Sequence, residues 1–489
     1  MNSMLYLRSL TAAALAAGVL SAQSQFDFGS VYLMSSYHAP AGGTPYPGIA
    51  RVDPVDGGVT PLVQFNTGSV PAASAAYDPY RDRIVAYCGL GTTLAPALYA
   101  IDAAGSWTTI ASTYLVRIAP RGDGKIYGYK AGAGHPTVQE VYYVDAAGQE
   151  QVLLDVGGAS PWRLNDGVPF NDNDPIRAMI YEPSENALFL ALMGSNLVPD
   201  CGAPSFDVSI RKLPLTADGT ALRAPASCND YDVGGTVSGL PVFETPVGFS
   251  YGPGHQLVLG VHTSASGAMP RILRVDPVTT TITPFATYGP FYGDVNFGCC
   301  AYCPLTGEAL VLEGGNDVWR GFTPGSSGGG RAFGSYGSPG FGGGPGDTLF
   351  VVTPIGNGFS LTADATSLSV ANGGAQNLDF HPGVAFANHI HLIVGSLSGW
   401  APGFTFAGAH IPLNLDWYSD FTLNAANSAF LVGTLGFLDT NGTAAAQVNY
   451  PAGILVGLQG LTMQHAAIAF DGTLAIVHVS NPVALHLLP

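Results

Sequence analysis

The sequence has few charged residues and no cluster of basic ones. Only 10% of its 489 residues are charged, and the formal net charge is −17. Binding to the phosphate backbone of nucleic acids or to an anionic membrane requires clustered Lys and Arg, so we expect neither as a partner. After the N-terminus no stretch reaches the ~18 apolar residues that a membrane-spanning helix needs. No segment shows the period of a long amphipathic helix either.

The first 25 residues differ from the rest of the chain. They contain one Arg, no acidic residue and the short apolar run "LTAAALAAGVL". This pattern is typical of a signal peptide and is too short to span a membrane. We therefore predict that residues 1–25 are removed on export and that the mature protein is secreted, extracellular or attached to the cell surface.

The composition of the remaining chain favours short strands joined by tight turns. Hydrophobic residues make up 47% of the sequence, enough to build a folded core. The chain contains 65 Gly and 36 Pro, and its Val, Ile, Tyr and Phe residues recur in short runs. This combination predicts an all-β protein.

A repeated unit organises residues 26–323. The string "RVDPV" occurs at Arg51–Val55 and again at Arg274–Val278, and four weaker copies place the key position at residues 102, 145, 213 and 322. Every unit except the first follows a strand–turn–strand pattern such as "AAYDPYRDRIVAY" (75–87). Four antiparallel strands in ~45 residues form one blade of a β-propeller. We interpret the repeated Asp residues as turn formers, because Asp caps local amides and Pro presets φ.

Six units predict a six-bladed β-propeller over residues 26–323. The first unit lacks an inner strand, and we expect a strand from the far end, with Arg331–Gly337 as the candidate, to close the ring. Residues 324–346 are rich in Gly, Ser and Pro and are interpreted as a linker or closing strand. Residues 347–489 alternate apolar and polar positions in short runs, which predicts an antiparallel β-sandwich module.

The repeats resemble the secreted YVTN- and NHL-like propeller repeats, with their "lyriDp-tG" turns. Such propellers include binding scaffolds, lactonases and lyases, so the resemblance implies a fold and not an activity. The C-terminal string from "GSLSGWAPGFTFAG" to "VSNPVALHL" resembles an uncharacterised module of exported planctomycete-type bacterial proteins. That resemblance implies a secreted accessory module with no assigned chemistry.

Acidic residues are predicted to gather on one face of the propeller. In a four-stranded meander, the loops that lead into inner strands share a face with the loops between second and third strands. The candidate ligand-binding residues on this face are Asp172, Asp174, Glu244, Asp294, His262 and His38. Ca²⁺ takes six to eight oxygen ligands, so Asp172, Asp174 and Asp294 are the candidate metal ligands. The alternative is a solvated polar loop with Asx turns.

Six cysteines in an exported chain suggest disulfides. Cys201 and Cys228 lie in two long loops of one predicted blade, on the same face, so we predict that they form a disulfide. For Cys299, Cys300 and Cys303 in "GCCAYCP", structural disulfides are favoured over metal or redox chemistry, and a vicinal or C-x-x-C pair is one conceivable arrangement. The pairing of these three cysteines and of Cys88 stays open.

Two further motifs lack the context that their chemistry requires. "GFSYG" matches G-x-S-x-G, but Ser250 falls in a predicted strand and not in a strand–turn–helix elbow. His389 and His391 lie two apart in a strand, as a metal-binding pair would. No third ligand can be assigned, so structural or surface histidines are favoured.

These patterns favour a non-enzymatic extracellular or cell-surface protein with a ligand-binding face, whose partner is a glycan or another extracellular protein. The alternative is a secreted hydrolase or lyase that acts on a polysaccharide or a lactone. In that case the same acids and His262 would hold a divalent cation or act as acid and base. A purely structural envelope component is the third hypothesis. Convergence of the candidate side chains on one pocket would favour the enzyme.

Overall fold

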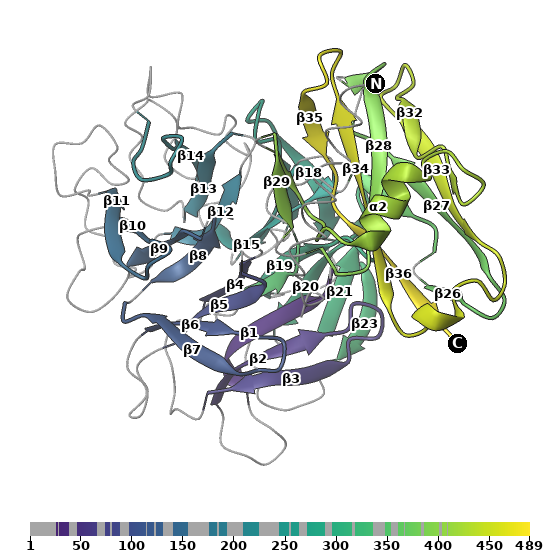
Figure 1. Ribbon diagram of the computed structural model, residues 1–489. Coiled ribbons are helices and arrows are strands. Elements are labelled where there is room, and N and C mark those ends of the chain that lie inside the picture. The colour runs from purple at the N-terminus through teal and green to yellow at the C-terminus, as the bar shows by residue number, and fades with distance from the viewer. Residues whose placement is uncertain are drawn as a thin grey trace. The chain divides into compact units, whose positions relative to one another are not determined.

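The chain folds almost entirely into β-strands, grouped in two compact units that are considered separately (Figure 1). The N-terminal unit comprises Gly29–Asp78 and Arg83–Gly356, and the C-terminal unit contains Asn357–Pro489. The computed structural model describes residues 26–27, 29–38, 46–65, 74–78, 81–88, 97–113, 115–121, 124–130, 140–154, 176–182, 185–192, 209–223, 244–253, 256–263, 271–288, 296–314, 318–335, 348–353, 360–365, 367–382, 386–400, 403–407 and 409–489.

Six sheets of mainly antiparallel strands make up the described part of the N-terminal unit. The first three have the strand orders β24 (Thr348–Val351), β1 (Val31–His38), β2 (Tyr46–Val52), β3 (Val59–Gln64); β4 (Ser74–Asp78), β5 (Arg83–Cys88), β6 (Ala97–Ile101), β7 (Trp107–Ala111); and β8 (Val116–Pro120), β9 (Ile126–Lys130), β10 (Glu140–Val144), β11 (Glu150–Leu154). The other three have the orders β12 (Ile176–Glu182), β13 (Ala187–Leu192), β14 (Ser209–Pro214); β15 (Glu244–Tyr251), β16 (Leu257–Thr263), β17 (Arg271–Val275), β18 (Ile282–Tyr288), with β22 (Ser327–Gly328) added in parallel; and β19 (Asn296–Cys303), β20 (Glu308–Gly314), β21 (Val318–Phe322), β23 (Arg331–Ser335).

One edge strand of each sheet belongs to a closed cycle. We call these six strands, β24, β4, β8, β12, β15 and β19, the inner strands. Each contacts the next in this order, and β19 contacts β24 again. Each also stands at the end of its sheet's strand order. The all-β class and the propeller-like arrangement of antiparallel sheets expected from the sequence are therefore confirmed.

Apolar side chains fill the spaces between neighbouring sheets. The strands that follow the inner strands are buried on both faces, as in Ile84–Tyr87 of β5 and Ala309–Leu312 of β20. One core cluster joins the first and sixth sheets, with Val31 and Leu33 packed against Leu310 and Leu312. Burying a side chain of this size contributes ~1.5–3 kcal/mol, so contacts between sheets supply much of the stability.

The repeated aspartates form turns, as the sequence indicates. The Oδ1 atoms of four of them accept a hydrogen bond of 2.8–3.0 Å from the backbone N–H two residues further on, namely in Asp53, Asp102, Asp145 and Asp276. The Asp102 turn also requires a glycine. A Cβ at Gly105, where φ is +80°, would lie 2.2 Å from the carbonyl oxygen of Leu62 in the preceding sheet.

Two predicted key positions are misplaced. Leu213 lies within β14 and is buried, and its turn begins at Thr216, whose N–H donates to the Ala221 carbonyl. Phe322 is the buried last residue of β21, so the turn follows it. Both residues are apolar because the strand end faces a neighbouring sheet. The degenerate repeat conceals this shift.

The strand that completes the first sheet is not the predicted one. β24 pairs with β1, with Val31 opposite Val351 and Met34 opposite Thr348. The expected closing segment, Arg331–Gly337, instead contributes β23 to the sixth sheet. β24 belongs to the N-terminal unit, whereas the sequence pattern places residues 347–489 in the C-terminal module. Short alternating strands look alike in sequence, and only pairing reveals which sheet each one joins.

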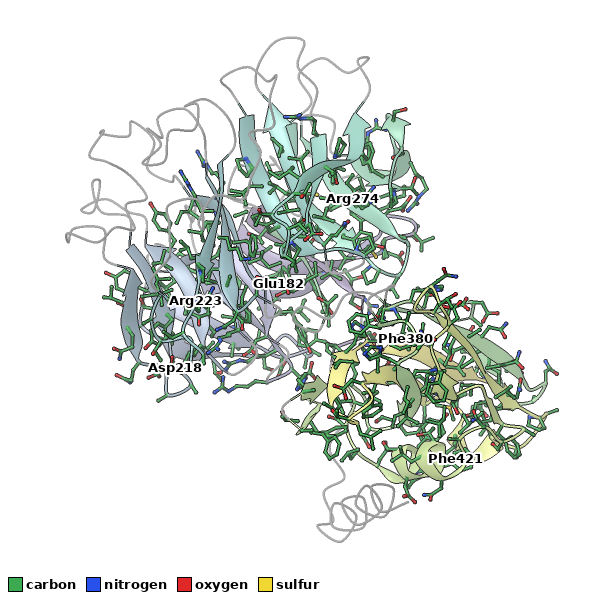
Figure 2. The ribbon with its side chains drawn as sticks, turned by 90° about the horizontal axis from the view of Figure 1, so that it is seen from above. Glu182, Asp218, Arg223, Arg274, Phe380 and Phe421 are labelled. Carbon is green, nitrogen blue, oxygen red and sulfur yellow. The ribbon has the colours of Figure 1, made fainter. Side chains whose placement is uncertain are left out.

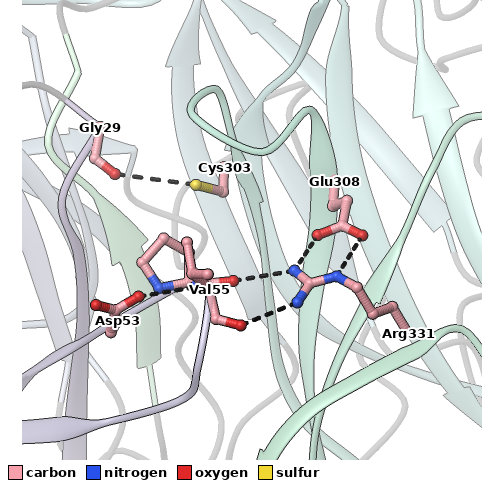
Figure 3. Close-up of polar contacts among 7 residues, drawn as sticks. Gly29, Asp53, Val55, Cys303, Glu308 and Arg331 are labelled. Atoms are coloured by element: carbon pink, nitrogen blue, oxygen red, sulfur yellow. Dashed lines mark hydrogen bonds and ion pairs between the residues drawn. The ribbon is translucent and has the colours of Figure 1, made fainter. Parts of the chain in front are cut away.

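Both "RVDPV" turns accept hydrogen bonds from a cation of the preceding sheet. Arg331 of β23 donates to the carbonyl oxygen of Pro54 at 3.0 Å (Figure 3), and Lys212 of β14 donates to that of Pro277 at 2.9 Å. The corresponding carbonyl of the fourth sheet, Ala217, accepts from Arg121 at 2.6 Å. The recurrence of the motif is thus explained by a turn that caps itself and presents a carbonyl to its neighbour.

Two of these cations, Arg331 and Lys212, each form an ion pair with a glutamate. Glu308, which is buried, binds Arg331 through Nε at 3.0 Å and through a second nitrogen at 2.5 Å (Figure 3). Glu185 binds Lys212 at 2.7 Å. The pair Glu308–Arg331 therefore links the sixth sheet to the turn of the first sheet.

Neither a vicinal nor a C-x-x-C disulfide forms within "GCCAYCP". Cys300 and Cys303 are free and buried on β19. Residues one or three apart on a strand point to opposite faces, so neither a vicinal nor a C-x-x-C pair can close there. Burial raises the pKa of Cys300 to about 12, which also opposes a reactive thiolate. Cys201 and Cys228 lie outside the described residues.

The described part of the C-terminal unit contains two larger sheets, one hairpin and one α-helix. The first sheet has the order β25 (Leu361–Ala363), β27 (Gly374–Phe380), β33 (Ala444–Tyr450), β31 (Leu431–Val432). The second has the order β26 (Ser367–Ser369), β36 (Val483–Leu488), β34 (Thr462–Phe470), β28 (Ile390–Ser396), β32 (Leu435–Phe437), with β35 (Ile476–Val479) also paired to β34. The remaining elements are β29 (Phe404–Phe406), β30 (Ala409–Ile411), α2 (Trp417–Asn424) and the 3₁₀ turn η4 (Val456–Leu458).

The two larger sheets share one apolar core. It includes Phe380 (labelled in Figure 2) and Val448 of the first sheet and Ile393 and Leu485 of the second. The side-chain amide of Gln376 in β27 donates to the carbonyl of Ala484 in β36 at 3.0 Å, which ties the sheets together. Within the described residues, no helix has the length and apolar character that crossing a membrane requires.

We predict that Arg331→Ala lowers the free energy of unfolding by about 2 kcal/mol, because it leaves the buried Glu308 carboxylate without its cation. Urea denaturation measures this. Arg331→Lys should lower the free energy of unfolding by less, because lysine keeps the positive charge although it cannot form the bidentate contact with Glu308. The double variant Glu308→Gln/Arg331→Ala should be more stable than Arg331→Ala. Equal stability of the double and single variants would contradict the role of the pair.

Candidate functional site

The inner strands surround a cavity of about 110 Å³. All six contribute to its lining, through Ser74–Tyr77, Arg117–Pro120, Arg177–Tyr181, Val247–Tyr251, Tyr302 and Thr348–Val351, together with Thr353. Each inner strand is paired on one side only. Its other edge therefore presents backbone N–H and C=O groups that no strand ladder uses.

Two arginines are the charged residues among those that line the cavity. Arg117 is the second residue of β8 and Arg177 the second residue of β12. β8 and β12 are neighbours in the cycle. The lining includes no Asp, Glu, Lys or His from the described part of the chain. The described lining thus includes two cationic side chains in a protein of net charge −17.

A β-bulge recurs near the start of four consecutive inner strands. In β12 the register passes from Ile176 opposite Leu192 to Ala178 opposite Ala191, which leaves Arg177 as the extra residue. In β15 and β19 the extra residues are Val247 and Gly298, and in β8 the two residues Arg117 and Ile118 stand opposite the single residue Gly128. A bulge changes the direction of its extra residue, and bulges are common beside functional sites.

Sequence reasoning overlooked both arginines, although a signal exists. Each is a charged residue at the second position of a short, otherwise largely apolar strand, in "VRIAP" and "IRAMI". Lys and Arg together number only 17 in the whole chain. The search for clustered basic residues missed them because they lie 60 positions apart in sequence (177 − 117).

Three of the predicted acidic residues, Asp172, Asp174 and Asp294, lie outside the described residues. No group of three or more His, Cys, Asp or Glu side chains in the described part of the chain is placed to hold a metal. The Ca²⁺ site stays a prediction.

The other three candidates occupy the expected strand ends. Glu244 is the first residue of β15, and His262 lies one residue before the end of β16, so their backbones share one end of the fifth sheet. His38 ends β1. The backbones of these three residues are described and their side chains are not. Convergence of the three side chains on one pocket is therefore still a hypothesis.

Ser250 does not occupy a nucleophile elbow. It lies inside β15, and its Oγ accepts a hydrogen bond from the N–H of Tyr302 at 2.8 Å. His389 and His391 are likewise engaged by carbonyl groups. The Nε2 of buried His391 lies 3.0 Å from the Gly433 oxygen, and the Nδ1 of His389 lies 3.2 Å from the Ala387 oxygen. These contacts favour the structural interpretation of all three residues.

One histidine of the C-terminal unit is fully buried. The Nε2 atom of His465 lies 2.8 Å from the hydroxyl of Tyr418, which also hydrogen-bonds the hydroxyl of Tyr450. Burial lowers the pKa of His465 to about 4. The imidazole is therefore neutral at pH 7 and acts as a structural hydrogen-bonding group.

Comparison with known proteins identifies no family. No family model matches the chain, and no curated protein sequence does. Among solved structures, a putative 6-phosphogluconolactonase from Bacteroides fragilis gives a TM-score of 0.36 at 11% identity, over 60% of this chain and 90% of that one. The β-propeller domain of Cps50 (Swd1) from Myceliophteria thermophila gives 0.33 at 10% identity, over 57% and 80%. Dihydro-heme d1 dehydrogenase NirN gives 0.35 at 11%, over 73% and 70%. At TM-scores this low we draw nothing about activity or ligand from these proteins.

We predict that the protein loses stability between pH 6.5 and pH 4 because of His465. The unfolded chain has the ordinary pKa of 6.5 and the folded state a pKa of about 4. Within this window only the unfolded state binds the proton, so the free energy of unfolding falls as the pH falls. The full effect corresponds to about 3 kcal/mol.

Urea midpoints at pH 7 and pH 5 measure this effect, and His465→Phe should flatten the difference between them. The exposed His486 offers a matched control, since His486→Gln should keep the parental dependence. If the midpoint of His465→Phe changes with pH as much as the parent's does, His465 is not the group responsible.

Proposed function

We propose that this chain is an exported extracellular or cell-surface protein that binds a ligand without converting it. In this proposal the six sheets of the N-terminal unit are the blades of a β-propeller. The closed cycle of inner strands supports that interpretation. The C-terminal unit is an accessory β-sandwich, supported by the apolar core that its two larger sheets share.

The cavity inside the cycle of inner strands is the observation that carries the binding function. Its unpaired strand edges offer alternating donors and acceptors, which suit hydroxyl groups because a hydroxyl does both. A volume of about 110 Å³ is smaller than the ~300–1,000 Å³ of drug-sized sites. We therefore infer that the ligand is small, or is the terminal residue of a glycan.

The polar side chains of the lining support binding more than hydrolysis. The hydroxyl oxygens of Ser74 and Ser250 each accept a backbone N–H, from Ile118 and Tyr302. General acid–base catalysis needs an ionisable group within hydrogen-bond reach of the substrate. The described lining contains tyrosines and arginines but no carboxylate or imidazole.

We predict that a glycan array probed with the mature protein identifies ligands, and that calorimetry locates them in the cavity. Ala76→Leu narrows the lining and should weaken binding at least tenfold. Ala221→Leu, on an exposed turn, should bind like the parent, and both variants should keep the parental melting temperature to within a few degrees. Failure of every array member to bind would overturn the proposed function, and unchanged affinity in Ala76→Leu would place the ligand elsewhere.

A Ca²⁺ site at the start of the inner strands is a separate proposal. Asp172, Asp174 and Asp294 are its ligands in this proposal, with Glu244 beside them at the first residue of β15. Carboxylates are the ligands that Ca²⁺ prefers, and a metal there would hold the loops of this face together.

We predict that EDTA lowers the melting temperature reversibly and that added Ca²⁺ restores it, because a ligand bound only to the folded state stabilises that state. Mg²⁺ should raise the melting temperature by less than Ca²⁺ does, because Mg²⁺ requires a smaller, octahedral site. Asp172→Asn/Asp174→Asn should remove the response. A melt that EDTA leaves unchanged would exclude a tight metal site at these acids.

A further inference from the structure

We propose that an apolar row on the C-terminal unit binds an extended, neutral polysaccharide chain. The row consists of Phe437, Ile390, Phe470 and Ile476, one residue from each of four neighbouring strands, and we call it the apolar row. This inference goes beyond the proposed function, because it assigns a second, separate binding site to the accessory unit. The register of the strands, the exposure of the row and the groups beside it support the assignment.

Cross-strand pairing brings the four residues into one line. Ile390 of β28 stands opposite Phe437 of β32 on one side and opposite Phe470 of β34 on the other. Phe470 in turn stands opposite Ile476 of β35, and the four strands lie next to one another (Figure 1). Residues directly opposite one another in a sheet project to the same face, so the row forms a flat strip. Its two phenylalanines are two strands apart, which is ~9.5 Å at the usual strand spacing.

The apolar row lies on the face of the second sheet that points away from the first sheet. β28 and β34 direct Ile393 and Ala467 into the core that the two larger sheets share. Alternate residues such as Ile468 pack in a second cluster with the hairpin of β29 and β30. Ile390 and Phe470 belong to this alternate set by their positions in the strands. Each stands at the end of its strand, so the row is the outermost line of an apolar face.

Exposure of the side chains rises toward the edge strand β32. Phe437 is 72% exposed, whereas Leu392 and Ile468 in the line behind the row are buried. Ile390 and Phe470 are partly exposed. A single exposed apolar side chain is common and needs no explanation. A contiguous apolar strip, by contrast, marks a binding surface.

The chemistry of the row suits the faces of sugar rings. A pyranose ring presents polarised C–H groups on its face, and the face of an aromatic ring carries negative charge density that attracts them. A separation of ~9.5 Å between Phe437 and Phe470 is close to the disaccharide repeat of an extended β-1,4-linked glycan. Alternate sugars would therefore stack on the two phenylalanines, and the sugar between them would contact Ile390.

Polar side chains stand beside the row. Asp471 directly follows Phe470, and His389 directly precedes Ile390. The pKa of Asp471 is lowered, chiefly by the hydroxyl of Thr473 and to a smaller extent by the nearby His389. Carboxylate and imidazole groups hydrogen-bond hydroxyls, which both donate and accept. A sugar chain on the row would thus find partners for its hydroxyl groups at the same end of the sheet.

The charge of this part of the chain favours a neutral polymer over other occupants. Residues 357–489 contain six Asp and no Glu, Lys or Arg. A polymer of uronic acids, a nucleic acid or an anionic membrane would be repelled by this charge. A second copy of the chain would bring the same negative charge to the contact. A neutral glycan meets no such repulsion.

The test measures depletion of the mature protein from solution by four materials: particles of cellulose, chitin and mannan, which are neutral, and beads that carry polygalacturonate, which is anionic. We expect retention on at least one neutral polymer and none on polygalacturonate. Phe437→Ala should weaken retention roughly tenfold, because the variant loses both ring stacking and apolar contact. Since Phe437 is largely exposed, this variant should keep the parental melting temperature to within a few degrees.

Trp417→Ala is the matched control, because Trp417 is also an exposed aromatic residue. Its neighbour Asp416 accepts the N–H of Leu397, beyond the end of β28 that lies opposite Ile390. We therefore expect Trp417→Ala to be retained like the parent. Equal losses in Trp417→Ala and Phe437→Ala would contradict a site at the row.

Two conservative variants separate ring stacking from simple apolar contact. Phe437→Tyr keeps the aromatic face and should be retained like the parent. Phe437→Leu keeps an apolar side chain without a ring, and its retention should weaken roughly fivefold, in line with the value of an aromatic contact. Retention of Phe437→Leu equal to that of the parent would overturn the stacking of sugars on the row.

The outcomes also separate this inference from the proposed function. Ala76→Leu, which narrows the cavity of the inner strands, should leave polymer retention unchanged. Loss of retention in Ala76→Leu but not in Phe437→Ala would overturn the site at the row and place the polymer in the cavity. Absence of retention on every neutral polymer would overturn this inference and leave the ligand of the cavity unaffected. Self-association that Phe437→Ala abolishes, without polymer retention, would also overturn it and identify a second copy of the chain as the occupant.

Discussion

The strand next to each inner strand is apolar on both faces, and the rest of the N-terminal unit depends on both faces being covered. Strands such as Ile84–Tyr87 and Ala309–Leu312 bury consecutive residues, so these strands could not face water on either side. A row of such sheets would leave two ends exposed. The cycle removes them, because the sixth sheet packs against the first and β24 returns to pair with β1. The contact from Arg331 to the Pro54 carbonyl lies at this junction, where the chain has the longest loop to close.

Closure of the cycle also creates the candidate site. Six strands that meet at their unpaired edges leave a space lined by backbone groups, whatever side chains they carry. Side-chain chemistry has to be introduced where the strand departs from regular pairing, since a regular inner strand directs its side chains toward the neighbouring sheets. The bulges at Arg117 and Arg177 provide this departure. The closed cycle of strands therefore forms both the scaffold and the cavity. The residue at the bulge differs from strand to strand: it is Arg177 in β12, Val247 in β15 and Gly298 in β19.

The sequence reveals the local parts of this arrangement and hides the others. The turns at Asp53 and Asp276 were predictable because the carboxylate and the amides that it caps are two or three residues apart. The closing strand was not, because Thr348–Val351 pairs with residues more than 300 positions earlier. The bulge at Arg177 depends on how β12 is aligned with β13. The sequence of one strand alone does not determine this register. The spacing of the cysteines in "GCCAYCP" is compatible with a disulfide only if they do not lie in one strand. Because they lie in β19, residues one or three apart point to opposite faces.

The distribution of cations extends this reasoning to the whole chain. Beyond Arg331 the sequence contains no Lys or Arg, and the C-terminal unit is joined by neutral groups, as in the bonds of Gln376 to Ala484 and His465 to Tyr418. The segment Asn357–Pro489 thus packs its two larger sheets together without a Lys or Arg of its own. The N-terminal unit uses its few cations where backbone carbonyls of the next sheet need a donor, as Lys212 and Arg331 do. Arg117 and Arg177, by contrast, are among the residues that line the cavity.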